Sequence, residues 1–150
     1  MNDQTGYAFR RPDSAEDWAA YNDIRRVSLF EERGRHGVYD DNHPDEFKAG
    51  NHPFLLLHDG APVATVRIDL IDGRRAIMRL VAVRTGCRGG GHGRVLLQHA
   101  EDFARARGCV EAVSNAATEA LAFYRRLGYE ERVWDASEAL RDSVQVVKAL

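Results

Sequence analysis

The chain has 150 residues, of which 44% are hydrophobic and 29% are charged, and its formal net charge at pH 7 is -2. This balance is typical of one globular core, so we expect residues 1–150 to form a single domain. The small net charge provides no broad positive field, which argues against nucleic acid as a partner. The sequence has no apolar run of membrane-spanning length and no export pattern at its start, so we expect a cytoplasmic protein that does not bind membranes.

The cysteines and histidines are sparse. Cys87 and Cys109 are the two cysteines, and the six histidines are scattered. Without an export signal, two cysteines predict reduced thiols rather than a disulfide framework. No His-x-x-x-His or Cys-x-x-Cys pair has the spacing of metal ligands, so we predict no metal site.

The first third of the chain predicts a strand, a helix and a polar loop. Residues 7–10 read as a short strand, and Asp13 or Ser14 can cap a helix whose apolar residues recur about every 3.6 positions. Gly34 and Gly37 end this helix. The polar segment 35–52 is either a mobile loop or a loop with a short helix near residues 44–48.

Three strands are expected next, at residues 53–58, 62–70 and 75–83, joined by hairpin turns at the two Asp-Gly pairs. A two-residue loop at Asp72-Gly73 would place Ile68 opposite Ile77 and Val66 opposite Arg79. One face would then be apolar except for Arg79: Ala64, Val66, Ile68, Leu70, Ile77 and Val81. The other face would carry Arg67 and Asp69 beside Met78 and Leu80, and we interpret these charges as solvated in preference to substrate-binding.

A glycine-rich loop follows the third of these strands. Gly86, Gly89, Gly90 and Gly91 precede a helical pattern that runs from Gly93 to about Arg107. Glycines allow tight turns and close approach to a ligand, and the first N–H groups of a helix lack partners within it. The helix dipole favours a phosphate there, and Arg88 and Arg94 add positive charge. The alternative is a turn that binds no ligand. Each glycine at a helix start destabilises the fold by about 0.5–1 kcal/mol relative to alanine. Because several such glycines in one loop are hard to explain by packing alone, we favour ligand binding.

The spacing of these residues selects among phosphate-binding motifs. A dinucleotide fingerprint starting at Gly89 would need glycine at Arg94, and a Walker A loop would need Gly-Lys-Ser/Thr where the chain has Gly91-His92-Gly93. What does fit is Arg88-x-x-Gly91-x-Gly93. It resembles the Arg/Gln-x-x-Gly-x-Gly/Ala signature of the GNAT superfamily of acyl-CoA-dependent N-acyltransferases, in which this loop holds the pyrophosphate of coenzyme A.

The last third predicts a strand at 109–114, a helix from 117 or 118 to 127, and closing strands at 129–134 and 143–147. Strands interleaved with helices and hairpins predict an α/β fold, with a single-layer mixed sheet covered by helices on both faces. The resemblance implies that this sheet is mostly antiparallel, as in the acyl-CoA N-acyltransferase fold.

A second motif supports the resemblance. In Ala120-x-x-Phe123-Tyr124-x-x-Leu127-Gly128-Tyr129, the apolar residues lie on one side of a short helix that Gly128 ends. A core helix with two packed aromatic residues is the structural alternative. The pattern is also similar to a motif that GNAT sequences carry after their pyrophosphate loop, and here it occurs in the same order.

The resemblance implies roles for individual residues. Tyr124 corresponds to the family's general acid, which protonates or hydrogen-bonds the sulfur of departing coenzyme A. The backbone of Val81 corresponds to the donor to the thioester carbonyl, and that of Val83 to the group that pairs with pantetheine. The residues expected to hold the pyrophosphate are Arg88, Gly89, Gly91, His92, Gly93 and Arg94.

The chain departs from the family pattern at two places. Where many members have asparagine before the tyrosine motif, this chain has Ala117, so we assign the cofactor-binding amide to Asn115. Some relatives also place a glutamate base in the strand before the loop, but residues 76–83 include no carboxylate. The proton acceptor is then water, Asp69 or a loop histidine, unless the amine arrives uncharged.

These motifs predict an N-acetyltransferase that moves the acetyl group of acetyl-CoA to a primary amine of a small molecule or peptide, by direct attack in a ternary complex. The alternative is an acyl-CoA-binding sensor that has lost turnover, and binding of another phosphate ligand ranks behind both. The acidic pairs Asp40-Asp41 and Asp45-Glu46 would suit a cationic amine. A homodimer is the assembly that the family implies.

Overall fold

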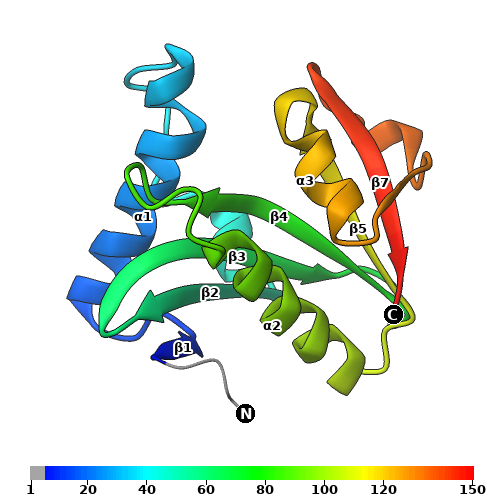
Figure 1. Cartoon of the computed structure of the whole chain (residues 1–150), viewed down its shortest axis with the longest axis horizontal. Coiled ribbons are helices and arrows are strands. Elements are labelled where there is room, and N and C mark those ends of the chain that lie inside the picture. The colour runs from blue at the N-terminus through cyan, green and yellow to red at the C-terminus, as the bar shows by residue number, and fades with distance from the viewer. Residues whose placement is uncertain (1–5) are drawn as a thin grey trace.

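A seven-stranded sheet forms the centre of the computed structural model, which describes residues 6–150 (Figure 1). Its strands are β1 (Tyr7–Arg10), β2 (Asn51–His58), β3 (Ala61–Leu70), β4 (Arg75–Val83), β5 (Glu111–Ala117), β6 (Glu130–Glu131) and β7 (Ser143–Ala149). Their order is β1-β2-β3-β4-β5-β7-β6, and every neighbouring pair is antiparallel except β4 and β5. The predicted mixed, mostly antiparallel sheet is confirmed.

Helices cover both faces of this sheet, as predicted. On one face, α2 (His92–Ala106) and α3 (Leu121–Arg126) pack on the larger core, which includes Val66, Ile68 and Met78. On the other face, α1 (Ala15–Leu29) places Tyr21 and Ile24 against strands β2 and β4. No α-helix within residues 6–150 is long and apolar enough to cross a membrane.

Local sequence explains how α1 starts and which side it buries. The Ser14 hydroxyl accepts a hydrogen bond from the Asp17 N–H at 3.1 Å, which satisfies one free donor of the first turn. Four buried residues at helical spacing then face the sheet: Tyr21, Ile24, Arg25 and Ser28. Two of the four are polar, so this helix carries functional groups as well as core residues into the interior.

The predicted register between β3 and β4 is wrong by one residue. Ile68 pairs with Met78 and Arg67 pairs with Arg79. The cause is a three-residue turn, in which the Asp72 carboxylate accepts from the N–H groups of Arg74 and Arg75, each at 3.0 Å. A one-residue slip moves side chains to the opposite face. Ile77 and Arg79 therefore lie on the α1 face with Arg67 and Asp69, and Met78 lies on the face of α2.

A bulge in β4 reverses this shift further along the strand. Between the pairs Arg67–Arg79 and Thr65–Ala82, β4 contains one residue more than β3. Leu80 has a φ of 53°, in the left-handed region that costs a residue with a side chain about 1–2 kcal/mol. After the bulge, Val81 and Val83 pack against the same core as Met78. Val81 thus lies on the predicted face.

The parallel strands β4 and β5 remain paired only from Arg75–Glu111 to Ile77–Val113. Beyond these residues they separate, and Figure 1 shows the two strands running together near the C-terminus and then parting. At the point of separation, the Ser114 hydroxyl donates to the carbonyl of Met78 at 2.8 Å. A side chain thus replaces the next backbone hydrogen bond of the ladder, and the following edge of β4 is left free.

The C-terminal elements differ from the prediction in their bounds. The expected strand at 109–114 lies at Glu111–Ala117, and the expected helix is divided into a 3-10 turn (Thr118–Ala120) and α3. The strand predicted at 129–134 is reduced to Glu130–Glu131. Gln145 accounts for this shortening, because its side chain accepts from the N–H groups of Trp134 and Asp135 and so binds a loop in place of a strand.

We expect Asp72→Ala to lower the melting temperature by a few degrees at neutral pH, because the turn loses its acceptor. Hydrogen bonds from backbone N–H groups and Arg75 lower the pKa of the Asp72 carboxyl. Its stabilising effect is therefore complete above the ordinary aspartate pKa of about 4 and is lost as pH falls through the lowered folded value. Thermal unfolding of both proteins from neutral pH down to about pH 2 tests this, and a difference that persists unchanged at the acid end would contradict it.

Candidate active site

The glycine loop forms a cradle at the start of α2. Gly89 and Gly91 have φ values of 85° and 84°, which a residue with a side chain adopts only at a cost. Gly91 precedes the first helical residue, and its carbonyl accepts from the N–H of Val95 at 3.2 Å. The N–H groups of residues 92–94 therefore have no partner within the helix and point out of its N-terminus, where they favour an anion.

Gly93 is required for packing as well. A β-carbon at this position would lie 3.0 Å from Cζ and 3.2 Å from Cε1 of Phe123, tighter than nine in ten real Cβ contacts, so the ring would have to shift. The first turn of α2 thus packs directly on the aromatic ring of α3. The two sequence motifs, although 30 residues apart in the chain, meet at this contact.

The two arginines of the loop differ in their surroundings. Arg88 donates to Glu32 at 2.6 Å, and the hydroxyl of Thr85 donates to the same carboxylate at 2.8 Å. The Arg88 hydrogen bond holds the pKa of Glu32 below its usual range. Arg94 is exposed at the mouth of the cradle. A phosphate would thus interact directly with the charge of Arg94, whereas the charge of Arg88 is offset by Glu32. The sequence analysis did not identify Glu32 as part of the loop.

The side chain of His92 connects the loop to the first strand. Its Nδ1 lies 2.6 Å from the hydroxyl of Tyr7, and its Nε2 lies beside Gly90. Burial lowers the pKa of His92, and the nearby ring of His58 acts in the same direction. The imidazole is therefore neutral at pH 7 and accepts from Tyr7. The imidazole then carries its hydrogen on Nε2, and the backbone N–H of His92 is one of the free donors at the start of α2.

The separated part of β4 presents backbone groups to open space. The N–H of Arg84 donates to the carbonyl of Val63 at 2.7 Å, and Ala82 pairs with Thr65. Because successive residues of a strand point their backbone groups to opposite sides, those of Val81 and Val83 point away from β3. They face the gap that the departure of β5 has opened.

Ser28 of α1 binds this same edge. Its hydroxyl donates to the Val83 carbonyl at 2.9 Å, which leaves the Val83 N–H and one carbonyl lone pair available. The sequence analysis gave Ser28 no functional role. The sequence signal that could have found it is a serine on the buried side of the helix, because a buried hydroxyl group needs a hydrogen-bond partner.

A cavity of about 700 Å³ opens where β4 and β5 part. It extends from the loop after α1 to α3, and the bulge residues Leu80 and Val81 form part of its wall. Tyr124 reaches it from α3, and Ser114 and Asn115 reach it from β5. The structure therefore brings together Val81, Tyr124 and Asn115, which the sequence analysis had selected separately.

Tyr124 is only 5% exposed and packs edge-to-face against Phe123 and Tyr129. Burial raises the pKa of its phenol, and the neighbouring hydroxyl of Ser114 offsets this only in part. The phenol therefore remains protonated through the neutral and mildly basic range. It is a hydrogen-bond donor at the junction of the glycine loop and the cavity.

Asn115 is anchored on the side of the cavity that faces α1. Its amide nitrogen donates to the carbonyl of Glu138 at 3.0 Å, and its Oδ1 is buried without a partner in the described part of the chain. An unpartnered buried acceptor is costly unless a ligand or water satisfies it. Its assignment to cofactor binding stays a prediction.

Three proton acceptors were considered, and two of them can now be compared. Asp69 is 5% exposed and receives three hydrogen bonds, two from Arg67 and one from Arg79. It does not line the cavity, so it is not placed to receive a proton from an amine bound there. The loop histidine that does line it is His43, whose Nδ1 accepts from the N–H of Asp45 at 3.1 Å.

The acidic segment is not the uniform surface that the sequence suggested. Glu46 is 6% exposed, forms an ion pair with Arg25 and accepts from the hydroxyl of Tyr21 at 2.8 Å. It belongs to a 3-10 turn (Pro44–Phe47) that packs beside β2. Asp40 and Asp45 do line the cavity. The charges Arg67 and Asp69 are likewise buried and paired, so our interpretation of them as solvated was wrong.

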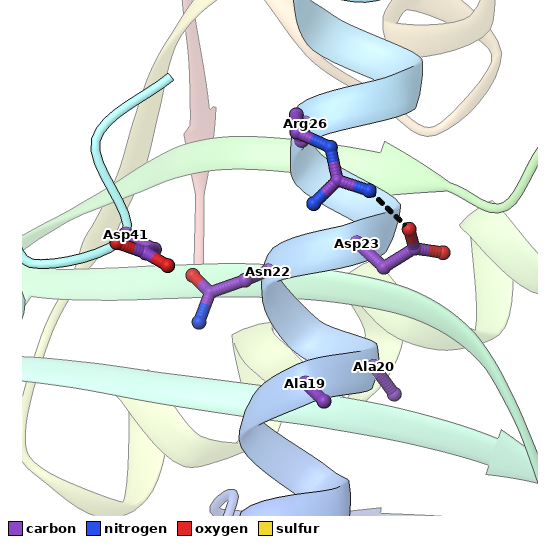
Figure 2. Close-up of a pocket in the computed structure, with 6 residues that line it drawn as sticks. All are labelled: Ala19, Ala20, Asn22, Asp23, Arg26 and Asp41. Atoms are coloured by element: carbon purple, nitrogen blue, oxygen red, sulfur yellow. Dashed lines mark hydrogen bonds and ion pairs between the residues drawn. The ribbon is translucent and has the colours of Figure 1, made fainter.

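A second hollow of about 550 Å³ lies on the outer side of α1 (Figure 2). It is lined by Ala19, Ala20, Asn22, Asp23, Arg26 and Asp41. Its polar groups are partly occupied by the Asp23–Arg26 ion pair that Figure 2 draws. Neither the glycine loop nor the tyrosine motif contributes to it, so we place the chemistry in the cavity between β4 and β5.

Comparison with known proteins identifies relatives of this chain. The profile of the acetyltransferase (GNAT) family matches residues 15–129. A putative N-acetyltransferase from Lactobacillus plantarum is 26% identical with a TM-score of 0.76, over 97% of this chain and 99% of that one.

Two more distant structures share the fold. N-acetylglutamate synthase from Neisseria gonorrhoeae, complexed with coenzyme A and N-acetyl-glutamate, is 19% identical with a TM-score of 0.77, over 99% of this chain and 36% of that one. The PaiA N-acetyltransferase from Thermoplasma acidophilum, in complex with coenzyme A, is 14% identical with a TM-score of 0.72, over 96% of this chain and 99% of that one.

The contact between the two motifs can be tested by Gly93→Ala. The added methyl group must displace the Phe123 ring, so we expect a loss of about 1–3 kcal/mol in unfolding free energy and weaker acetyl-CoA binding. Phe123→Leu in the same chain should recover part of the lost stability, because it removes the atoms that collide. Calorimetry and thermal unfolding of both single variants and the double variant measure this coupling, and additive effects would contradict the contact.

Proposed function

The chain belongs to the acetyltransferase (GNAT) family and is an acyl-CoA-dependent acetyltransferase, and from this premise we propose that it acetylates a primary amine of a small molecule or peptide. The amine attacks the thioester directly, with both substrates bound at once. The observation that carries the proposal is the convergence of Val81, Tyr124 and an open cavity at the place where β4 and β5 separate.

The cradle fits the pyrophosphate of coenzyme A. It combines the left-handed backbone of Gly89 and Gly91, the free N–H groups of residues 92–94 and the exposed charge of Arg94. A side chain at Gly93 would close it against Phe123. Pantetheine would then lie along the open edge of β4. There the N–H of Val83 would donate a hydrogen bond to pantetheine, as it would to a neighbouring strand.

Acetyl-CoA supplies the activated thioester, and the chain stabilises the charge that develops on it. The N–H of Val81 points into the gap, where it can donate to the carbonyl oxygen as the amine nitrogen bonds to the carbonyl carbon. The bulge at Leu80 gives this N–H its direction, which explains why the strained conformation is retained at this position.

Tyr124 stabilises the sulfur as the carbon–sulfur bond breaks. The reference pKa of a phenol, about 10, already exceeds the thiol value of about 8.5, and burial raises the pKa of Tyr124 further. Full proton transfer to the departing thiolate is then uphill, so the phenol acts mainly by hydrogen bonding. Binding the amine beside the thioester supplies the rest of the rate acceleration, since it removes several kcal/mol of entropic cost from the activation barrier.

A second candidate is an acyl-CoA-binding sensor without turnover. It is favoured by the position of Asp69, whose carboxylate is held by Arg67 and Arg79 and does not line the cavity where an amine would bind. A sensor would bind acetyl-CoA and release no thiol with any amine. Thiol release across a broad amine panel therefore separates the two functions.

We expect Tyr124→Phe to lower kcat by about 10- to 100-fold, because the leaving sulfur loses its donor. The dissociation constant of acetyl-CoA should change less than about twofold, since binding depends on the glycine loop. Because burial raises the pKa of Tyr124, the wild-type rate should not fall between pH 8 and about pH 10 through loss of this proton. Steady-state rates over this range test both points, and an unchanged kcat in the variant would remove Tyr124 from the chemistry.

A further inference from the structure

Six arginines line the cavity, and three of them belong to α1 or to the central sheet. Arg25 comes from α1, Arg67 from β3 and Arg79 from β4. Arg25 is 3% exposed and Arg67 is 5% exposed, so two full charges lie almost entirely inside the protein. Burying charged groups is costly, and their presence at the wall of a cavity requires an explanation.

The carboxylates that neutralise these arginines lie outside the cavity lining. Glu46 pairs with Arg25, while Asp69 accepts from Arg67 at 2.8 and 2.9 Å and from Arg79 at 2.6 Å. Burial opposes the charge of Arg67, but its hydrogen bonds to Asp69 leave its pKa raised. The acids therefore keep the guanidinium groups charged and oriented, and leave them facing the space in front.

The wall has more donors than acceptors. Three guanidinium groups carry about fifteen N–H donors, and they make five hydrogen bonds to carboxylates, of which Glu138 accepts one from Arg79 at 3.0 Å. Arg25 Nε is buried and has no partner in the described structure. Arg67 uses Nε and Nη2 on Asp69, and its Nη1 has no hydrogen bond within residues 6–150.

Stability alone does not account for this arrangement. Arg67 and Arg79 are direct cross-strand partners, and like charges at such positions are destabilising. Replacing buried ion pairs by apolar residues of similar volume is often neutral or stabilising. Stability is therefore a weak reason for charges at the wall where a substrate would lie, and their position points to a role in binding.

The position of the arginines relative to the reaction centre is defined by the strand itself. Arg79 immediately precedes the bulge at Leu80, and Val81 follows it, so the donor-rich wall adjoins the N–H proposed to bind the thioester carbonyl. Three aspartates line the cavity: Asp40 and Asp45 come from the segment between α1 and β2, and Asp142 precedes β7. An acceptor with an acid group on the arginines could thus direct its amine toward Val81.

We propose that the acceptor is a primary amine that carries a carboxylate, and that Arg67, with Arg25 and Arg79, binds this carboxylate. This inference rests on the proposed acetyl transfer and names the substrate class of that site. A guanidinium group offers paired donors that match a carboxylate, whereas a purely cationic amine would find donors where it needs acceptors. This proposal differs from the expectation of a cationic acceptor, which was drawn from the acidic segment.

Matched amines provide the test on the wild-type protein. Alanine is compared with ethylamine, lysine with cadaverine, and tyrosine with tyramine, so that each pair differs by the α-carboxylate and the second amine has no carboxylate. Phosphoethanolamine is compared with ethanolamine to test whether the arginines bind a phosphate group instead of a carboxylate. We expect kcat/KM to fall about 10- to 100-fold when the α-carboxylate is removed from the preferred amino acid. Equal or faster turnover of the decarboxylated amine, or turnover of phosphoethanolamine and of no amino acid, would overturn the proposal.

Substitutions of the arginines test where the carboxylate of the acceptor binds. Arg67→Met should raise KM for the preferred amino acid at least about 10-fold, and Arg67→Lys should restore only part of the loss, because lysine lacks the paired donors. KM for acetyl-CoA should stay unchanged. Arg79→Lys, at a half-buried position, provides a second variant in case Arg67 variants fail to fold. The matched control is Arg132→Gln, which removes the exposed Arg132–Glu111 ion pair of 2.7 Å outside the cavity.

Binding measurements separate failure of this inference from failure of the proposed function. Each matched pair is titrated into the protein saturated with coenzyme A, and heat is recorded without any need for turnover. If no amine releases thiol but the amino acid binds and its decarboxylated partner does not, acetyl transfer fails and the carboxylate site stands. If thiol is released with cadaverine and tyramine and not with the amino acids, acetyl transfer stands and the carboxylate site is wrong.

Discussion

The separation of β4 and β5 after the Ile77–Val113 pair is the feature on which the rest of the site depends. An unpaired strand edge is normally a liability, because its free N–H and C=O groups invite unwanted pairing. Here the free edge lies inside the protein, between α1 and α3, and Ser114 satisfies the carbonyl at which pairing stops. The remaining groups of Val81 and Val83 are available to a ligand that behaves as an added strand.

The bulge at Leu80 determines which groups meet in that gap. Before it, Arg79 lies on the α1 face with Asp69, and after it, Val81 and Val83 lie on the face of α2 and α3. One strand therefore supplies an arginine to the acceptor side and N–H groups to the thioester side. A regular strand would put alternate residues on fixed faces and could not make this change within three residues.

The sequence revealed the glycine loop, the tyrosine helix and the order of elements, because each depends on local chemistry such as a positive φ or a helix stop. It did not reveal the register of β3 and β4, since Asp72 forms a three-residue turn where the Asp-Gly pair predicts two residues. Val81 was placed on the correct face because the bulge cancels that error. Arg25 and Glu46 were missed as a buried pair because their pairing joins segments far apart in sequence.

Residue-resolved amide hydrogen exchange with and without acetyl-CoA tests the central claim most directly. The account predicts that acetyl-CoA slows exchange at Val81 and Val83, whose N–H groups face the gap, and leaves Ala82, already paired with Thr65, nearly unchanged. Slowed exchange at His92 and Gly93 with no change at Val81 and Val83 would contradict it. Acetyl-CoA would then be held by the loop alone, and the free edge of β4 would have no part in aligning the thioester.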